Sequence, residues 1–164
     1  MGGLRAWAMS RQVLSPQIIE RDAFEVLGIE FSATAESDFG VFWRRYALRL
    51  KEFEGRVPER EAYAVAYGFD AAHETFTYLT GFEFDGRAPV PQDWTVVELP
   101  AETYAAFETT LDRIDETIDE VHTEWLPNSR YERVESPKFE YYDPGFDADD
   151  PASTFSFFVP IRAP

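Results

Sequence analysis

The segment Phe139-Glu140-Tyr141-Tyr142 places one carboxylate among three aromatic residues. In a strand, the alternation of side chains puts Glu140 and Tyr142 on one face and Phe139 and Tyr141 on the other. Such a carboxylate is either a buried anchor for a ligand or a charge that an edge strand exposes to water. In the first case burial raises its pKa, and a cationic ligand restores the ionised form. A buried Glu140 therefore predicts selection of cations, with cation–π contacts from aromatic neighbours.

The composition excludes several other kinds of chemistry. The chain has no cysteine, so disulfides, thiolate metal ligands and a cysteine nucleophile are excluded. Its two histidines, His73 and His122, have no further His or Cys at metal-ligand spacing, and a zinc site would need more ligands. No phosphate-binding loop, Gly-x-Ser-x-Gly elbow or dinucleotide-binding fingerprint is present. We therefore expect no metal and no other cofactor.

The charge balance is strongly acidic, because 15 basic and 31 acidic residues give a net charge of −16. A phosphate backbone would be repelled, so direct nucleic-acid binding is not expected. Only two of the basic residues are lysine, Lys51 and Lys138. This composition is typical of a halophilic protein, in which molar salt screens the repulsion between acidic side chains. It also occurs in an acidic mesophilic protein. No membrane-spanning apolar run and no signal peptide is found, so we expect a cytoplasmic protein.

Two segments have the apolar spacing of amphipathic helices. The first spans residues 38–53, with Ser37 or Asp38 as its expected N-cap and Gly55 as its expected end. The second spans residues 111–126, with Thr110 as cap and Pro127 as stop.

Strand-like patterns surround these helices. They lie at residues 18–31 (with a kink at Gly28), 63–69, 76–84, 95–99, 103–107, 139–142 and 154–161. Gly81 interrupts one of them, which predicts a bulge or a close backbone approach. The order strand–helix–strand–strand occurs twice, which predicts an α+β fold of two βαββ modules. We expect modules at about residues 18–87 and 95–162, forming a single domain, 18–162, after an N-terminal extension, 1–17.

Seven short motifs follow one another in a recognisable order. They are Val26-Leu27-Gly28-Ile29, Phe42-Trp43, Tyr67-Gly68, Tyr78-Leu79-Thr80-Gly81, Leu99-Pro100-Ala101-Glu102-Thr103-Tyr104-Ala105-Ala106-Phe107, Trp125-Leu126-Pro127-Asn128-Ser129-Arg130-Tyr131 and Phe139-Glu140-Tyr141-Tyr142. From residue 18 to 161 this order resembles the GyrI-like (gyrase-inhibitor-like) effector-binding domain, which also occurs in AraC-type and MerR-type multidrug-responsive regulators. The Trp-Leu-Pro-x-Ser-x-Tyr run followed by Phe-Glu-x-Tyr is the most specific part.

The resemblance implies two βαββ modules about a pseudo-two-fold axis, with an aromatic ligand groove between them. It implies that Glu140 pairs there with cationic, often planar, lipophilic ligands. The aromatic residues that would line the groove are Trp43, Tyr67, Tyr78, Phe107, Trp125 and Tyr142. Each can instead belong to the core, which is the favoured interpretation for Phe107 and Trp125. Because about 17 residues precede the first strand, too few for a helix-turn-helix domain, we expect a stand-alone sensor module.

Three functions are compatible with this resemblance. The leading one is a monomeric protein that senses or sequesters amphipathic cationic or aromatic compounds, and that reports them to a partner such as a regulator. The second is a hydrolase of strained electrophilic xenobiotics, in which Glu140 activates water and Tyr67 or Tyr142 donates a proton. The third is a protein-binding modulator of DNA gyrase. Binder and enzyme would use the same residues, so the sequence does not separate them.

Overall fold

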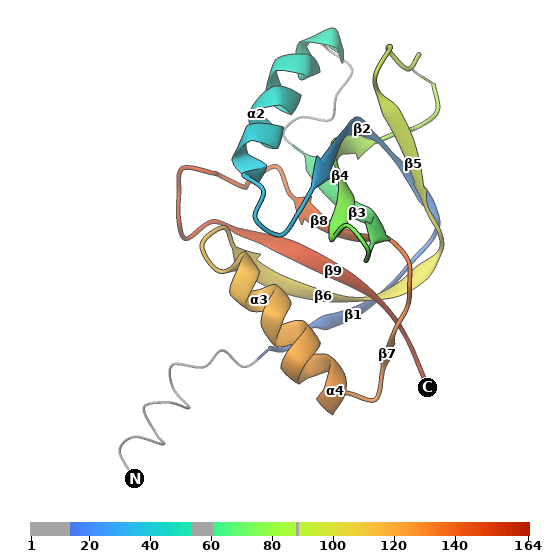
Figure 1. Ribbon diagram of the computed structural model, residues 1–164, viewed down its shortest axis with the longest axis vertical. Coiled ribbons are helices and arrows are strands. Elements are labelled where there is room, and N and C mark those ends of the chain that lie inside the picture. Colours follow the sequence, from blue (N-terminus) through green and yellow to red (C-terminus); the bar gives the residue numbers. More distant parts are fainter. Residues whose placement is uncertain (1–13, 54–60, 88) are drawn as a thin grey trace.

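The computed structural model describes residues 14–53, 61–87 and 89–164, and shows a strongly curled antiparallel sheet with two helical segments (Figure 1). The strands are β1 (Gln17–Arg21), β2 (Phe24–Ala33), β3 (Ala62–Asp70), β4 (Thr75–Glu83), β5 (Thr95–Leu99), β6 (Glu102–Thr110), β7 (Glu132–Arg133), β8 (Lys138–Tyr142) and β9 (Thr154–Arg162). The first helical segment is α2 (Phe39–Arg49) with the 3-10 turn η1 (Leu50–Phe53). The second is α3 (Ile114–Glu120), the π-helical turn η2 (Val121–Trp125) and α4 (Leu126–Asn128).

The strand order is β1-β6-β9-β8-β3-β4-β2-β5, with β7 also paired to β9. The predicted α+β class is therefore confirmed. The first strand of each expected module pairs with a strand of the other module: β1 pairs with β6, and β5 pairs with β2. The two parts of the sheet join where β8 pairs with β3. A pseudo-two-fold axis relating the modules stays a prediction.

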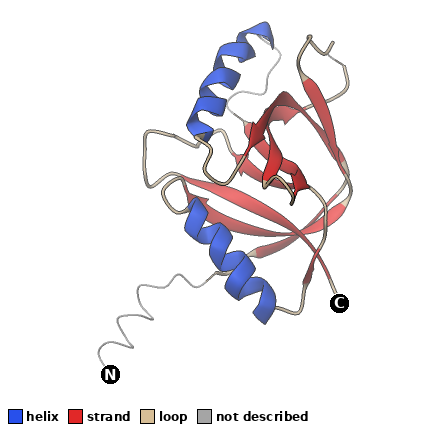
Figure 2. Cartoon of the chain, in the orientation of Figure 1, coloured by secondary structure: helices blue, strands red, loops and turns tan. Residues whose placement is uncertain are grey.

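Both helical segments pack on the same face of the sheet (Figure 2). One buried cluster, which includes Leu27 and Phe82, lies under α2, and another, which includes Phe107 and Val159, lies under α3. A third cluster lies between them and contains Tyr78 and Tyr142. The opposite face of the sheet has its own core. None of the helices in the described residues is long and apolar enough to cross a membrane.

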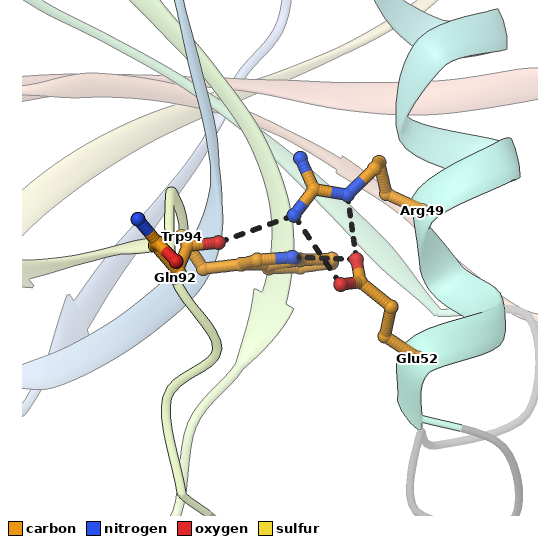
Figure 3. Close-up of polar contacts among 4 residues, drawn as sticks. All are labelled: Arg49, Glu52, Gln92 and Trp94. Atoms are coloured by element: carbon orange, nitrogen blue, oxygen red, sulfur yellow. Dashed lines mark hydrogen bonds and ion pairs between the residues drawn. The ribbon is translucent and has the colours of Figure 1, made fainter.

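The C-terminal end of α2 is tied to the turn before β5 by polar contacts (Figure 3). Glu52 accepts hydrogen bonds from Arg49 Nε at 2.6 Å and from Trp94 Nε1 at 3.0 Å. Arg49 Nη2 also donates to the Gln92 carbonyl oxygen at 3.2 Å. The Trp94 ring packs 4.6 Å from the ring of Phe53. These contacts hold α2 in place over the sheet.

The strand expected at residues 18–31 is broken, but not at Gly28. It divides after Arg21, because β1 pairs with β6 whereas β2 pairs with β4 and β5. Gly28 lies directly opposite Gly81, and a Cβ on either residue would collide with the backbone of the facing strand. The close backbone approach predicted at Gly81 is thus confirmed.

The N-terminus of the first helix is as predicted, since the Asp38 side chain accepts a hydrogen bond from the Gly40 N–H at 3.1 Å. The expected end at Gly55 and residues 1–13 of the N-terminal extension lie outside the described residues.

The ends predicted for the second helix are wrong. Thr110 does not cap it, because its hydroxyl donates to Asp112 and the helix begins only at Ile114. Pro127 does not stop it either but lies inside α4. The π-helical turn η2 ends two residues before this proline, whose ring would clash with the carbonyl four residues back in a regular α-helix.

Candidate functional site

Glu140 lies near the centre of the sheet, on the face that carries both helical segments. On β8 it pairs with Ala64 of β3 and Phe157 of β9. Its side chain is half-buried and shares its face with Tyr142, as the alternation predicts. The edge-strand interpretation of this carboxylate is wrong, because β8 has a neighbouring strand on each side.

Side chains from α2 and β4 complete the surroundings of this carboxylate. The Tyr142 hydroxyl donates a hydrogen bond to Glu140 Oε1 at 2.5 Å. Trp43 Nε1 of α2 donates to the Tyr78 hydroxyl of β4 at 3.2 Å. The Trp43 and Tyr142 rings meet edge to face, with centroids 5.1 Å apart. We call Trp43, Tyr78, Glu140 and Tyr142 the Glu140 cluster.

The pKa of Glu140 is raised to about 7, and burial is the largest cause. The negative charge of Asp115 on α3 also raises this pKa, whereas hydrogen bonding by the Tyr142 and Tyr78 hydroxyls lowers it. Burial and the nearby Glu140 charge hold the pKa values of both tyrosines well above their usual range. Within the described part of the chain, no Lys, Arg or His side chain forms an ion pair with Glu140. The carboxylate is therefore costly to ionise, because no cation of the described residues serves as its counter-ion.

A row of alanines on β3 lies beside the carboxylate, and sequence reasoning missed it. Ala62, Ala64 and Ala66 pair with Tyr142, Glu140 and Lys138. These three successive residues on the helix-facing side of β3 are thus small, which leaves room over the strand for larger groups. The signal was the repeat Ala-x-Ala-x-Ala at residues 62–66.

Phe146, in the loop between β8 and β9, was also missed. Its ring packs 4.9 Å from the Tyr142 ring and 5.7 Å from the Phe155 ring. Its neighbours from Asp143 to Asp150 are exposed, whereas Phe146 itself is half-buried. The signal was a single aromatic residue within a run of aspartates.

Three aromatic residues in the predicted set lie elsewhere. Tyr67 is on the opposite face of the sheet, where its hydroxyl donates to Glu30 at 2.7 Å, so it does not reach Glu140. The rings of Phe107 and Trp125 pack against each other under α3, with centroids 5.2 Å apart. For the hydrolase alternative, the structure brings Tyr142 to the carboxylate and not Tyr67.

Residues 17–161 match the family model described as Cass2, integron-associated effector binding protein. The transcriptional regulator BrlR of Pseudomonas aeruginosa is 34% identical over 152 residues, which are 88% of this chain and 54% of the regulator. The chain therefore spans about half the length of that curated relative.

Solved structures share the fold at low identity. SAV2435 bound to tetraphenylphosphonium has a TM-score of 0.70 at 16% identity, over 90% of this chain and 94% of that one. The integron cassette protein of Vibrio cholerae has a TM-score of 0.59 at 15% identity, over 91% and 97% of the two chains. EcmrR, in a complex with DNA, has a TM-score of 0.70 at 13% identity, over 99% of this chain and 63% of that one.

Proposed function

The chain belongs to the integron-associated effector-binding (Cass2) family, with the GyrI-like fold, and from this premise we propose that it binds amphipathic aromatic cations at the Glu140 cluster. One observation carries the proposal: a half-buried carboxylate, with no ion-pair partner in the described part of the chain, lies among aromatic rings. A bound cation would supply the missing counter-ion, and the rings would stack on its aromatic groups. Tetraphenylphosphonium, which is bound to SAV2435, is a cation of this class.

The rings of the Glu140 cluster pack on one another in this structure. Ala64 is only 2% exposed, so the floor of the site is covered by its neighbours. Ligand entry therefore requires ring–ring contacts to open. Glu140 is half-buried, so part of its side chain is exposed to solvent. The rings of a bound aromatic cation would replace these contacts, so opening costs little in apolar burial.

Titration with tetraphenylphosphonium and neutral triphenylphosphine oxide tests the proposal. Glu140→Gln is expected to weaken cation binding by a factor of roughly 30 or more and to change binding of the neutral compound little. Because the Glu140 pKa is about 7, parent affinity for the cation should rise about tenfold from pH 6 to pH 8, and that of Glu140→Gln should not.

Glu108→Gln is the matched control, because Glu108 is exposed on β6 and the charge change is the same. It should bind both compounds like the parent. Equal cation affinity of the parent and Glu140→Gln would remove Glu140 from the site.

A second candidate, hydrolysis of strained electrophilic compounds, is favoured by the same contact between Tyr142 and Glu140. A carboxylate with a pKa of about 7 is suited to take a proton from water at neutral pH. The neighbouring Tyr142 hydroxyl could donate one to the opened product. Incubation with a cyclopropane-bearing electrophile, followed by mass spectrometry, distinguishes the candidates: hydrated product that Glu140→Gln fails to form favours the hydrolase.

A further inference from the structure

Lys138 is the second charged residue on the helix-facing side of β8. Alternation puts it on the same face as Glu140, about 7 Å away along the backbone. Lys138 pairs across the strands with Ala66, as Glu140 pairs with Ala64. The row of alanines therefore lies beside both charged residues, Glu140 and Lys138.

These two charges do not neutralise each other. Lys138 Nζ lies 5.0 Å from the centre of the Phe69 ring, and within the described residues Lys138 forms no ion pair with a carboxylate. Its side chain is half-buried, and burial followed by the charge of Arg133 lowers its pKa. Partial burial makes the ammonium charge more costly, and a nearby opposite charge offsets this cost. The chain has 31 acidic residues, but none of those that the structure describes pairs with Lys138, which leaves a place for an external anion.

Aromatic rings connect the two charged positions. Phe69, which is 60% exposed, stacks on Phe76 with centroids 5.1 Å apart. Phe76 stacks on Phe39 at 6.4 Å, and Phe39 contacts Tyr78 at 4.7 Å. Tyr78 in turn interacts with Glu140. A planar ligand over the alanine row can thus contact rings along the whole distance between the charges.

We propose that Lys138 is an anion-binding position of the same site, so that the preferred ligands are zwitterions: a planar aromatic body with a cationic group at Glu140 and a carboxylate at Lys138. This inference rests on the proposed function, because it extends the ligand that Glu140 anchors. The ligand carboxylate would accept a charge-assisted hydrogen bond from Lys138. The acidic surface repels anions only weakly at physiological salt, where the Debye length is about 8 Å.

Two related dyes test the proposal: rhodamine 6G, a cationic ethyl ester, and rhodamine 19, its free acid, which adds a carboxylate to the same cation. Fluorescence anisotropy at pH 8 gives both dissociation constants for the parent, Lys138→Met and Lys51→Met. Methionine keeps an apolar side chain of similar length over Phe69. Lys51 is exposed on η1, so its variant controls for the change in net charge.

We expect the parent and Lys51→Met to bind rhodamine 19 about tenfold more tightly than rhodamine 6G. Lys138→Met should lose this preference through weaker rhodamine 19 binding alone. Should Lys138→Met lose its folded near-ultraviolet circular dichroism, Lys138→Arg and Lys138→Gln provide the same contrast, with the preference kept only by arginine.

Unchanged rhodamine 19 affinity in Lys138→Met overturns the role of Lys138. The proposed function then survives if rhodamine 6G binding still requires Glu140. If Glu140→Gln binds both dyes like the parent, the proposed function itself fails, and the zwitterion inference fails with it.

Discussion

The ionisation of Glu140 is set by neighbours from several elements. Burial and Asp115 of α3 raise its pKa, whereas hydrogen bonding by Tyr142 and Tyr78 lowers it, and the balance is about 7. An ionised carboxylate in this position destabilises the empty protein, because none of the described cationic side chains pairs with it. The same property favours a cationic ligand.

Glu140→Gln is expected to stabilise the protein at pH 8 and to have little effect near pH 4.5. The folded-state pKa of about 7 lies above the ordinary value of 4.5, so stability present below pH 4.5 is lost as pH rises toward 7. At about 1.4 kcal/mol per pKa unit, and with partial exposure, the loss is about 2–3 kcal/mol. The neutral amide avoids it.

Thermal unfolding of the parent, Glu140→Gln and the exposed control Glu108→Gln measures this difference. A gain of roughly 5–10 °C at pH 8 is expected for Glu140→Gln alone. Equal melting temperatures of Glu140→Gln and the parent at pH 8 would contradict a costly ionised Glu140.

At the scale of elements, the loop between β8 and β9 connects the site to the surface. Asp143 shapes its first turn: its carboxylate accepts from the Gly145 N–H at 2.8 Å and its carbonyl oxygen from the Phe146 N–H at 3.0 Å. The turn directs the Phe146 ring onto Tyr142, whose hydroxyl contacts Glu140. An acidic loop thus covers one side of a site proposed to bind cations.

Phe146→Ala is expected to speed association of tetraphenylphosphonium by a factor of about two or more. The change removes a ring that must move when the Glu140 cluster opens, while the acidic residues that attract cations remain. Stopped-flow quenching of tryptophan fluorescence measures the rate, and Leu48→Ala, which shortens an exposed apolar side chain of α2 outside the Glu140 cluster, is the control. An unchanged association rate in Phe146→Ala would show that the loop does not limit entry.

At the scale of the whole molecule, the Glu140 cluster lies across the junction between β3 and β8. Trp43 and Tyr78 come from the first half of the chain, and Glu140 and Tyr142 from the second. Neither half alone contains all four residues of the Glu140 cluster, so ligand binding requires that the two halves of the sheet pack together correctly.

Charge is divided unevenly between these halves. Residues 1–82 carry 9 basic and 12 acidic groups, whereas residues 83–164 carry 6 and 19. Repulsion within the second half opposes folding, and salt screens it. We expect the melting temperature to rise as KCl increases from low to molar concentration; a flat or falling value would contradict the halophile interpretation and leave the fold unaffected.

Much of the local structure was predictable from the sequence. The period of two placed Glu140 and Tyr142 on one face, and the helical spacing of residues 38–53 gave α2 and its cap at Asp38. These features depend on backbone sterics and on neighbours within a few residues, which the sequence states directly.

Relations between distant segments required the tertiary structure. Alternation assigns Tyr67 a face within β3, but only the pairing of Ala64 with Glu140 shows that this face is opposite to that of the carboxylate. The exchange of β1 and β5 between the modules, and the position of Pro127 inside a helix, likewise arise from packing. Strand register and partner choice are decided by the apolar surface that the whole sheet buries, and no local pattern contains that information.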